Sequence, residues 1–248
     1  MKTSKNKKII YRLGAKDTDI KHFKDKCPLD ATDIIEPFGG SYALCRILYN
    51  DDKYNKYVND NDPVIIKIFE NPEKLILLHE EWNKLINNSK NILLKKKSSG
   101  HVQNRQDFQK EWFKDDDILR KYIYYIQVVR GTISKKFPDV SEGLKFIKKI
   151  IFTPQNYIDV LERHINNENA FIFLDPPYMF SNNTTYSAQF DKNDNTDMLY
   201  IILDYFKKSK AKIMLIINDL HIIRHLFKDY NFLHIKKHMD LVDEQKHI

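Results

Sequence analysis

Short apolar runs, separated by segments with helical spacing, organise most of the chain. Residues 170–174 (AFIFL) are apolar at every position, which is typical of a strand buried on both faces of a parallel sheet. Shorter runs predict four further strands at 33–36, 57–60, 149–152 and 212–217. Residues 232–236 are a candidate for a last strand.

Apolar residues recur at helical spacing between these strands. The pattern predicts helices at 41–48, 63–69, 157–164, 197–206 and 221–227. Pro63 stands at the start of its helix, where its missing backbone donor does no harm. Strands that alternate with helices over short links indicate an α/β fold with a Rossmann-like, doubly wound sheet.

The middle of the chain has a different character. Residues 75–92 and 108–129 show long helical patterns rich in lysine and aromatic residues, and predicted loops at 95–101 and 131–143 follow them. Because strand–helix alternation is missing here, we interpret 75–145 as a mainly helical insert. The core then consists of 9–74 and 146–248. Residues 1–8 are basic and lack an apolar pattern, so we expect a disordered tail.

Composition narrows the class of protein. A length of 248 residues suits one large domain or a core with an insert. The formal charge of +7 favours a polyanion such as nucleic acid as partner, although an AT-rich coding sequence would also enrich lysine. Neither of the two cysteines lies in a C-x-x-C pattern, which indicates a reducing compartment and no zinc site. No segment reads as a secretion signal or a membrane span, so we expect an intracellular protein.

The most informative segment follows the apolar run at 170–174. It reads Asp175-Pro176-Pro177-Tyr178, at the strand end where open α/β sheets bind ligands. The prolines remove two backbone donors, so the Asp175 carboxylate and the Pro176 carbonyl can both accept hydrogen bonds from one group. Tyr178 adds a flat face. This set suits a planar base with an exocyclic amino group, whereas an ordinary strand-to-loop turn is the plain alternative.

Two further segments carry weaker signals. Residues 34–41 read as a strand, a glycine turn and a helix start, where Gly39 and Gly40 allow close approach of a ligand. A simple helix-start turn explains this segment equally well, and the absence of G-x-G-x-x-G argues against a dinucleotide fingerprint. Asp60 ends the next strand, where Rossmann-like sheets bind ribose hydroxyls, although a solvated turn acid would look the same.

In this order the segments resemble the Dam-type (D12 class) DNA adenine-N6 methyltransferases, which use S-adenosylmethionine. The matching stretches are 12–16 (RLGAK), 36–42 (EPFGGSY), 59–60 (ND), 150–157 and 175–178 (DPPY). The resemblance implies a methyltransferase sheet with an inserted target-recognition region. It also implies site-specific methyl transfer from S-adenosylmethionine to the amino group of a flipped adenine in double-stranded DNA. Tyr42 stands where the family has a glycine.

The resemblance also implies roles for single residues. Catalysis would fall to Asp175, Pro176, Pro177 and Tyr178. Cofactor binding would fall to Arg12, Gly14, Lys16, Glu36, Pro37, Phe38, Gly39, Gly40, Ser41, Asp60 and Asp175. Lys16 would lie near the methionine part and Asp60 at the ribose. DNA contacts are expected from Lys95, Lys96, Lys97, Arg105 and Arg130 in the insert.

The resemblance indicates the partners and the biological role only in general terms. No metal is needed, because the positive sulfur of the donor makes its methyl group electrophilic. We expect a monomer or weak dimer in the cytoplasm, at the nucleoid or in a viral factory, acting in restriction–modification or viral genome modification.

Two other functions stay open. One is a catalytically weakened homologue that only binds DNA or S-adenosylmethionine, suggested by Tyr42 and by the lack of a recognisable family strand motif before Ile248. The other is methylation of RNA or of a protein glutamine, because similar motifs occur in such enzymes. The long insert between the glycine turn and residues 175–178 favours DNA.

Overall fold

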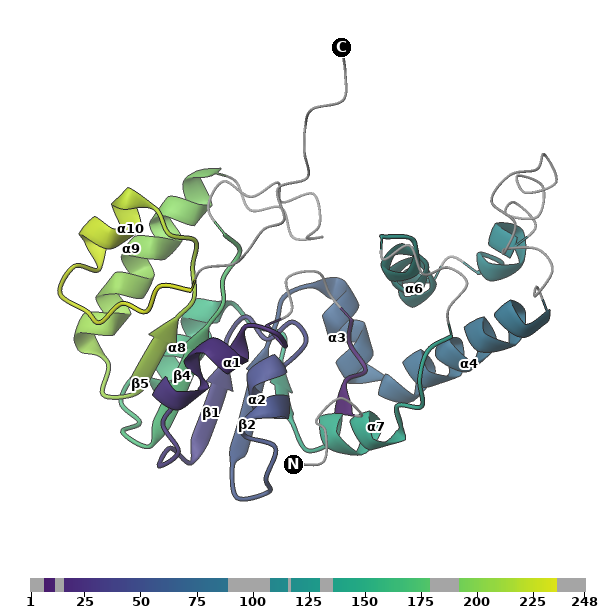
Figure 1. Cartoon of the computed structure of the whole chain (residues 1–248), viewed down its shortest axis with the longest axis horizontal. Coiled ribbons are helices and arrows are strands. Elements are labelled where there is room, and N and C mark those ends of the chain that lie inside the picture. The colour runs from purple at the N-terminus through teal and green to yellow at the C-terminus, as the bar shows by residue number, and fades with distance from the viewer. Residues whose placement is uncertain are drawn as a thin grey trace, which may run out of the picture.

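A sheet of five parallel strands forms the centre of the molecule (Figure 1). The computed structural model describes residues 7–11, 16–88, 108–115, 117–129, 136–178 and 192–235. The strands are β1 (Asp33–Glu36), β2 (Asn55–Asn59), β3 (Ile151–Thr153), β4 (Ala170–Leu174) and β5 (Lys212–Leu215). Their order is β3-β2-β1-β4-β5, which reverses direction between β1 and β4. The sheet is therefore doubly wound, as the sequence predicts.

The described residues also form helices, which cover the sheet or extend to one side of it. They are α1 (Ile20–Phe23), α2 (Ala43–Ile47), α3 (Pro63–Glu70), α4 (Pro72–Asn88), α6 (Ile118–Val129), α7 (Ser141–Ile147), α8 (Tyr157–His164), α9 (Lys192–Lys208) and α10 (His221–Leu226), with a short 3₁₀ turn η2 (Lys24–Lys26). Residues 108–112 are also helical. Every helix in this described part of the chain is too short or too polar to cross a membrane.

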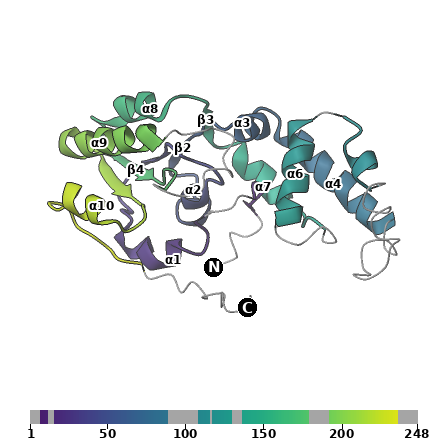
Figure 2. The ribbon, with the colours of Figure 1, turned by 90° about the horizontal axis from the view of Figure 1, so that it is seen from above.

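The alternation of side chains along β4 explains how helices cover both faces of the sheet. Phe171 and Phe173 belong to a core that includes residues of α1 and α2. Ile172 and Leu174 belong to a second core, built with α8 and α9. Figure 2 shows these two pairs of helices on opposite sides of the strands. All residues of β4 are buried, which confirms the central strand predicted from its apolar run.

Three local predictions are corrected. The helical pattern over 108–129 is interrupted after residue 112, and α6 begins at Ile118 because the Asp117 side chain accepts a hydrogen bond from the Leu119 amide (2.7 Å) and caps the helix. The loop predicted to end at 143 ends earlier, since α7 begins at Ser141.

The third correction concerns the last strand predicted at 232–236. The described residues 231–235 form no strand, and Lys236 lies outside the described residues. Phe232 and Leu233 are 45% and 50% exposed. Ile235 packs partly against the core that contains Phe171, but the exposed side chains of Phe232 and Leu233 give the segment little packing reason to join the sheet beside β5.

The helices between β2 and β3 share a core with the sheet. The ring of Trp82 on α4 packs edge-on against those of Phe108 and Trp112, with centroids 5.0 Å apart in each case. Trp112 donates its indole N–H to the Arg120 carbonyl (2.9 Å). This aromatic cluster continues into the buried residues that contact Phe171 of β4. Figure 1 shows α4 and α6 to one side of the sheet, beyond α3 and α7.

The N-terminal segment ties these helices to the sheet. The Tyr122 hydroxyl, on α6, donates to the Tyr11 carbonyl (2.8 Å) and accepts from the Tyr11 amide (2.7 Å). The Tyr42 hydroxyl donates to the Lys7 carbonyl (3.2 Å) and accepts from the Ile9 amide (3.3 Å). Two tyrosines on different elements therefore hold one short segment.

Gly143 on α7 lets this segment pass. A Cβ at Gly143 would lie 2.4 Å from Ile9 Cγ2 and 2.9 Å from the Lys7 carbonyl oxygen, so a larger residue would push the segment away. Of the tail predicted at 1–8, residues 1–6 lie outside the described residues. Lys7 takes part in this packing, and Lys8 forms an ion pair with Asp17 (3.0 Å).

Trp82→Ala should lower the free energy of unfolding by about 3–5 kcal/mol, because it removes a fully buried indole from the shared core. Leu77→Ala is the control on the same helix: its side chain is 61% exposed, and the change should stay within about 0.5 kcal/mol. Urea denaturation followed by circular dichroism measures both. A separate early transition, with the main one unchanged, would contradict a single shared core.

Candidate active site

Two motifs far apart in the chain meet at the carboxyl edge of the sheet. β1 pairs in parallel with β4, so the glycine turn that follows β1 and residues 175–178 that follow β4 leave the sheet side by side. The strand order reverses at this pair of strands. In open α/β sheets such a reversal creates the crevice in which ligands bind. The catalytic and glycine motifs predicted from the sequence therefore share one edge.

Asp60 closes the glycine turn from the neighbouring strand. One carboxylate oxygen accepts a hydrogen bond from the Gly40 amide (2.8 Å), and the other accepts one from the Asp62 amide (2.9 Å). Gly40 has a φ of 48°, a conformation that glycine adopts without strain. Asp60 is buried, and these two backbone donors offset part of the cost of burying its carboxylate. Asp60 and Gly40, both predicted cofactor residues, are thus in contact.

Asn59 has a structural role that the sequence did not suggest. Its side-chain N–H groups donate to the carbonyls of Pro37 and Gln155 (3.0 Å each). Its oxygen accepts from the Thr153 hydroxyl and the Gln155 amide (2.9 Å each). One buried amide therefore joins the ends of β1, β2 and β3. The sequence signal that could have indicated this role is an asparagine at the end of a predicted strand. A side-chain amide buried there must find hydrogen-bond partners for its donors and its acceptor.

Glu36 ends β1 beneath the turn. Its carboxylate accepts a hydrogen bond from the Cys45 amide of α2 (2.8 Å) and is almost completely buried. Burial raises the pKa of Glu36 to about 7, and the amides of Cys45 and Leu44 and the charge of Arg46 oppose this rise only in part. Glu36 thus links the strand to the start of the helix on the other side of the turn.

Lys16 is in contact with the predicted catalytic motif. Its Nζ lies 2.7 Å from Asp175 Oδ1 and 5.0 Å from the centroid of the Tyr178 ring. The Lys16 side chain is 7% exposed and that of Asp175 is 19% exposed. Burial lowers the pKa of Lys16, but attraction to Asp175 and Tyr178 outweighs it, so the pKa is raised and the ammonium is charged. Three predicted site residues therefore form one cluster.

The remaining predicted residues fall into two groups. Pro37, Ser41, Pro176 and Pro177 are buried in the walls of this edge, and the ring of Phe38 lies 5.0 Å from that of Tyr157 on α8. The other group lies outside the described residues: Arg12, Gly14, Lys95, Lys96, Lys97, Arg105 and Arg130. No group of three or more histidine, cysteine or acidic side chains suited to a metal occurs in the described parts of the chain.

Tyr42 has the backbone conformation that glycine favours. Its φ is 42° and its ψ 45°, an arrangement that costs a larger residue about 1 kcal/mol or more. The side chain is fully buried, with ring contacts to Phe69 and Phe146. Packing of the ring against these neighbours offsets the strained backbone.

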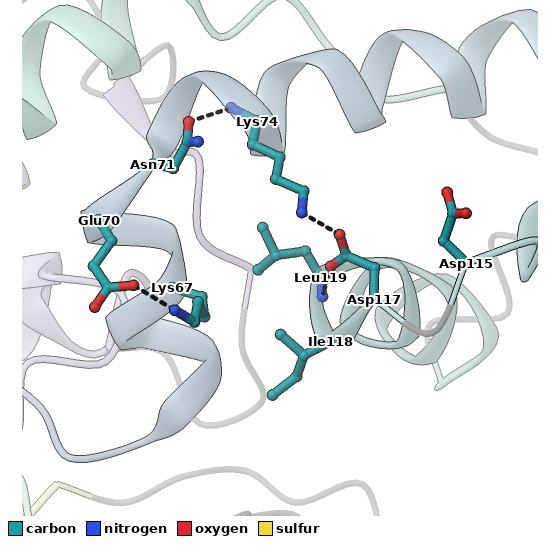
Figure 3. Close-up of a pocket in the computed structure, with 8 residues that line it drawn as sticks. All are labelled: Lys67, Glu70, Asn71, Lys74, Asp115, Asp117, Ile118 and Leu119. Carbon is teal, nitrogen blue, oxygen red and sulfur yellow. Dashed lines mark hydrogen bonds and ion pairs between the residues drawn. The ribbon is translucent and has the colours of Figure 1, made fainter.

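A separate hollow of about 550 Å³ lies between α3, α4 and α6 (Figure 3). Its lysines are already neutralised: Lys67 pairs with Glu70 (2.7 Å), and Lys74 pairs with Asp117. None of its lining residues follows a strand of the sheet. The hollow thus lacks the strand-end acids and glycines that mark the edge described above.

Gly39→Ala should destabilise the fold, because a Cβ there would lie 2.2 Å from Val58 Cγ1 on β2. We expect a loss of about 1–3 kcal/mol, measured by thermal or urea unfolding. The double variant Gly39→Ala/Val58→Ala is the matched test, since it removes the clashing methyl group. If the two losses simply add, the clash is not the cause.

Comparison with known proteins agrees with this geometry. The family model described as D12 class N6 adenine-specific DNA methyltransferase matches residues 133–241, which include β3, β4, residues 175–178 and β5. Over 90% of its length the chain is 23% identical to the Type II methyltransferase M.CviBI of Paramecium bursaria Chlorella virus NC1A, covering 87% of that protein. Residues 133–241 therefore resemble the D12 class N6 adenine-specific DNA methyltransferases, and the activity that both comparisons indicate is methylation of adenine in DNA.

Proposed function

We propose that this chain moves a methyl group from S-adenosylmethionine to N6 of an adenine that has left the DNA duplex, at the edge formed by residues 175–178. The observation that carries the proposal is the meeting of this motif with the glycine turn at the reversal point of the sheet. A methyl donor follows from the family match, and S-adenosylmethionine is the donor whose chemistry suits this edge.

The residues at this edge fit that donor. S-adenosylmethionine carries a sulfonium, an ammonium and two ribose hydroxyls, and the carboxylates of Glu36, Asp60 and Asp175 lie at or below the same strand ends. The absence of a side chain at Gly39 keeps the turn tightly packed on β2. When bound, the donor supplies a methyl carbon that its positive sulfur makes electrophilic. We keep the predicted assignments of Arg12 and Gly14 to this donor.

The chain's own residues would prepare the adenine. Its amino nitrogen is a poor nucleophile because the lone pair is delocalised into the ring. The Asp175 carboxylate and the Pro176 carbonyl would accept the two amino hydrogens and favour a tetrahedral nitrogen with its lone pair directed at the methyl group. Tyr178 would stack on the base and recover part of the few kcal/mol that flipping costs. Positioning and electrostatics supply most of the rate gain.

We assign DNA recognition to the segment 75–145, whose helices α4, α6 and α7 lie between β2 and β3 in the chain. Its proposed contacts are Lys95, Lys96 and Lys97 for phosphates and Arg105 and Arg130 for base edges. Arg120 is excluded from this role: it is buried, pairs with Glu81 (2.6 Å) and lies over the Trp112 ring.

Asp175→Ala should reduce methyl transfer at least ~100-fold, because it removes the charged acceptor for the adenine amino group. The measurement is transfer of a tritiated methyl group to unmethylated DNA, with the product mapped as N6-methyladenine.

Tyr178→Ala should weaken base capture, whereas Tyr178→Phe should retain it because stacking needs only the ring. Calorimetry with S-adenosylmethionine shows whether each variant still binds the donor.

Different outcomes separate the alternatives. Unchanged turnover in Asp175→Ala would refute the assigned site. Donor binding without transfer to DNA would favour a weakened homologue, and transfer to RNA in preference to DNA would favour an RNA methyltransferase.

A further inference from the structure

The proposed function gives Asp175 and Tyr178 to the adenine, yet one lysine contacts both of them. Lys16 Nζ lies 2.7 Å from Asp175 Oδ1 and 5.0 Å from the Tyr178 ring centroid. The lysine comes from the segment before α1, whereas the other two residues follow β4. Lys16 therefore reaches the centre of the proposed adenine site, beyond the place near the methionine part of the donor that family resemblance implies.

The low solvent exposure of Lys16 and Asp175 strengthens the attraction between them. Lys16 is buried and Asp175 is mostly covered, so water screens their charges only weakly. The raised pKa of Lys16 means that the ammonium is charged at neutral pH. A fixed positive charge at 2.7 Å favours the ionised form of the Asp175 carboxylate, which is the form that accepts hydrogen bonds at both oxygens.

The backbone of Lys16 is firmly held, so the position of its ammonium follows from the fold. The Lys16 carbonyl accepts hydrogen bonds from the amides of Asp19 and Ile20 (3.0 Å each). The next residue, Asp17, pairs with the buried Arg46 of α2. The backbone at Lys16 is therefore anchored through its own carbonyl and through the side chain of Asp17.

We propose that Lys16 is a positioning residue for Asp175, which holds the carboxylate ionised and oriented so that its remaining acceptor sites meet the adenine amino group. A carboxylate offers about four acceptor directions, so one ion pair leaves room for an amino hydrogen. The inference rests on the proposed function and deepens it, since Lys16 acts on the base through Asp175.

The other charged groups at this edge have different partners. Asp60 accepts from the amides of Gly40 and Asp62, and Glu36 accepts from the Cys45 amide. Tyr178 is the further titratable group that interacts with Lys16. Lys16 is therefore the cation against which the pH response of Asp175 is tested.

The test compares Lys16→Met, Lys16→Arg and the control Lys21→Met, an exposed lysine of α1. Methylation of unmethylated DNA is measured from about pH 5 to 9, with kcat and the KM for S-adenosylmethionine separated. Lys16→Met should lower kcat about tenfold or more, because Asp175 is no longer oriented, and should move the acid limb up by about one pH unit. Lys16→Arg should keep the wild-type acid limb, and Lys21→Met should match wild type.

The pattern that would overturn the inference is a wild-type acid limb in Lys16→Met, with only the KM for the donor raised. Lys16 would then serve the donor alone. The proposed function fails in a different way, by absence of methyl transfer in the wild type or by full activity of Asp175→Ala.

A second readout does not depend on activity. The carboxyl ¹³C shift of Asp175, identified by its loss in Asp175→Asn, is followed against pH in wild type and Lys16→Met. We expect the titration to move to higher pH in Lys16→Met, and an unmoved titration would overturn the inference. Unfolding of Lys16→Met, Asp175→Asn and the double variant gives the coupling of the pair, and additive losses would likewise count against it.

Discussion

The parallel pairing of β1 with β4 is the interaction on which the rest of the site depends. Asp33, Ile34 and Ile35 pair with Ala170, Phe171 and Ile172 in register. Because parallel strands end at the same edge, this register brings the glycine turn beside the motif that begins at Asp175. A slip by one residue would move Ile34 and Ile35 to the wrong cores, so burial on both faces protects the register.

Each acid near this edge has its own partner, and the partner decides what the acid can do. Glu36 and Asp60 accept hydrogen bonds from backbone amides and hold the turn together. Asp175 instead pairs with the side chain of Lys16. Two acids therefore hold the backbone of the turn in place. The third, Asp175, is paired with a side chain and keeps acceptor sites for a ligand.

The N-terminal segment explains how the chain accommodates Tyr42. The hydroxyl of this residue contacts the backbone at Lys7 and Ile9, and its ring packs against Phe69 and Phe146. The extra side chain is thus directed into the core, where it holds the segment that Tyr122 also holds. Tyr42 thus links the glycine turn to the N-terminal segment and to the helices that follow β2.

The sequence by itself determined the class of sheet and predicted a site at the end of β4. An unbroken apolar run identified β4, and the acid, prolines and tyrosine after it identified the proposed catalytic edge, because these signals are local. The break before α6 was missed, since it depends on the cap that Asp117 provides. The strand expected at 232–236 did not form because Phe232 and Leu233 stay exposed. Only the tertiary structure decided that Lys16 contacts Asp175 and that Asn59 joins three strand ends. Such contacts join residues far apart in the chain, and no local pattern of polarity specifies which distant partner a buried polar group will find.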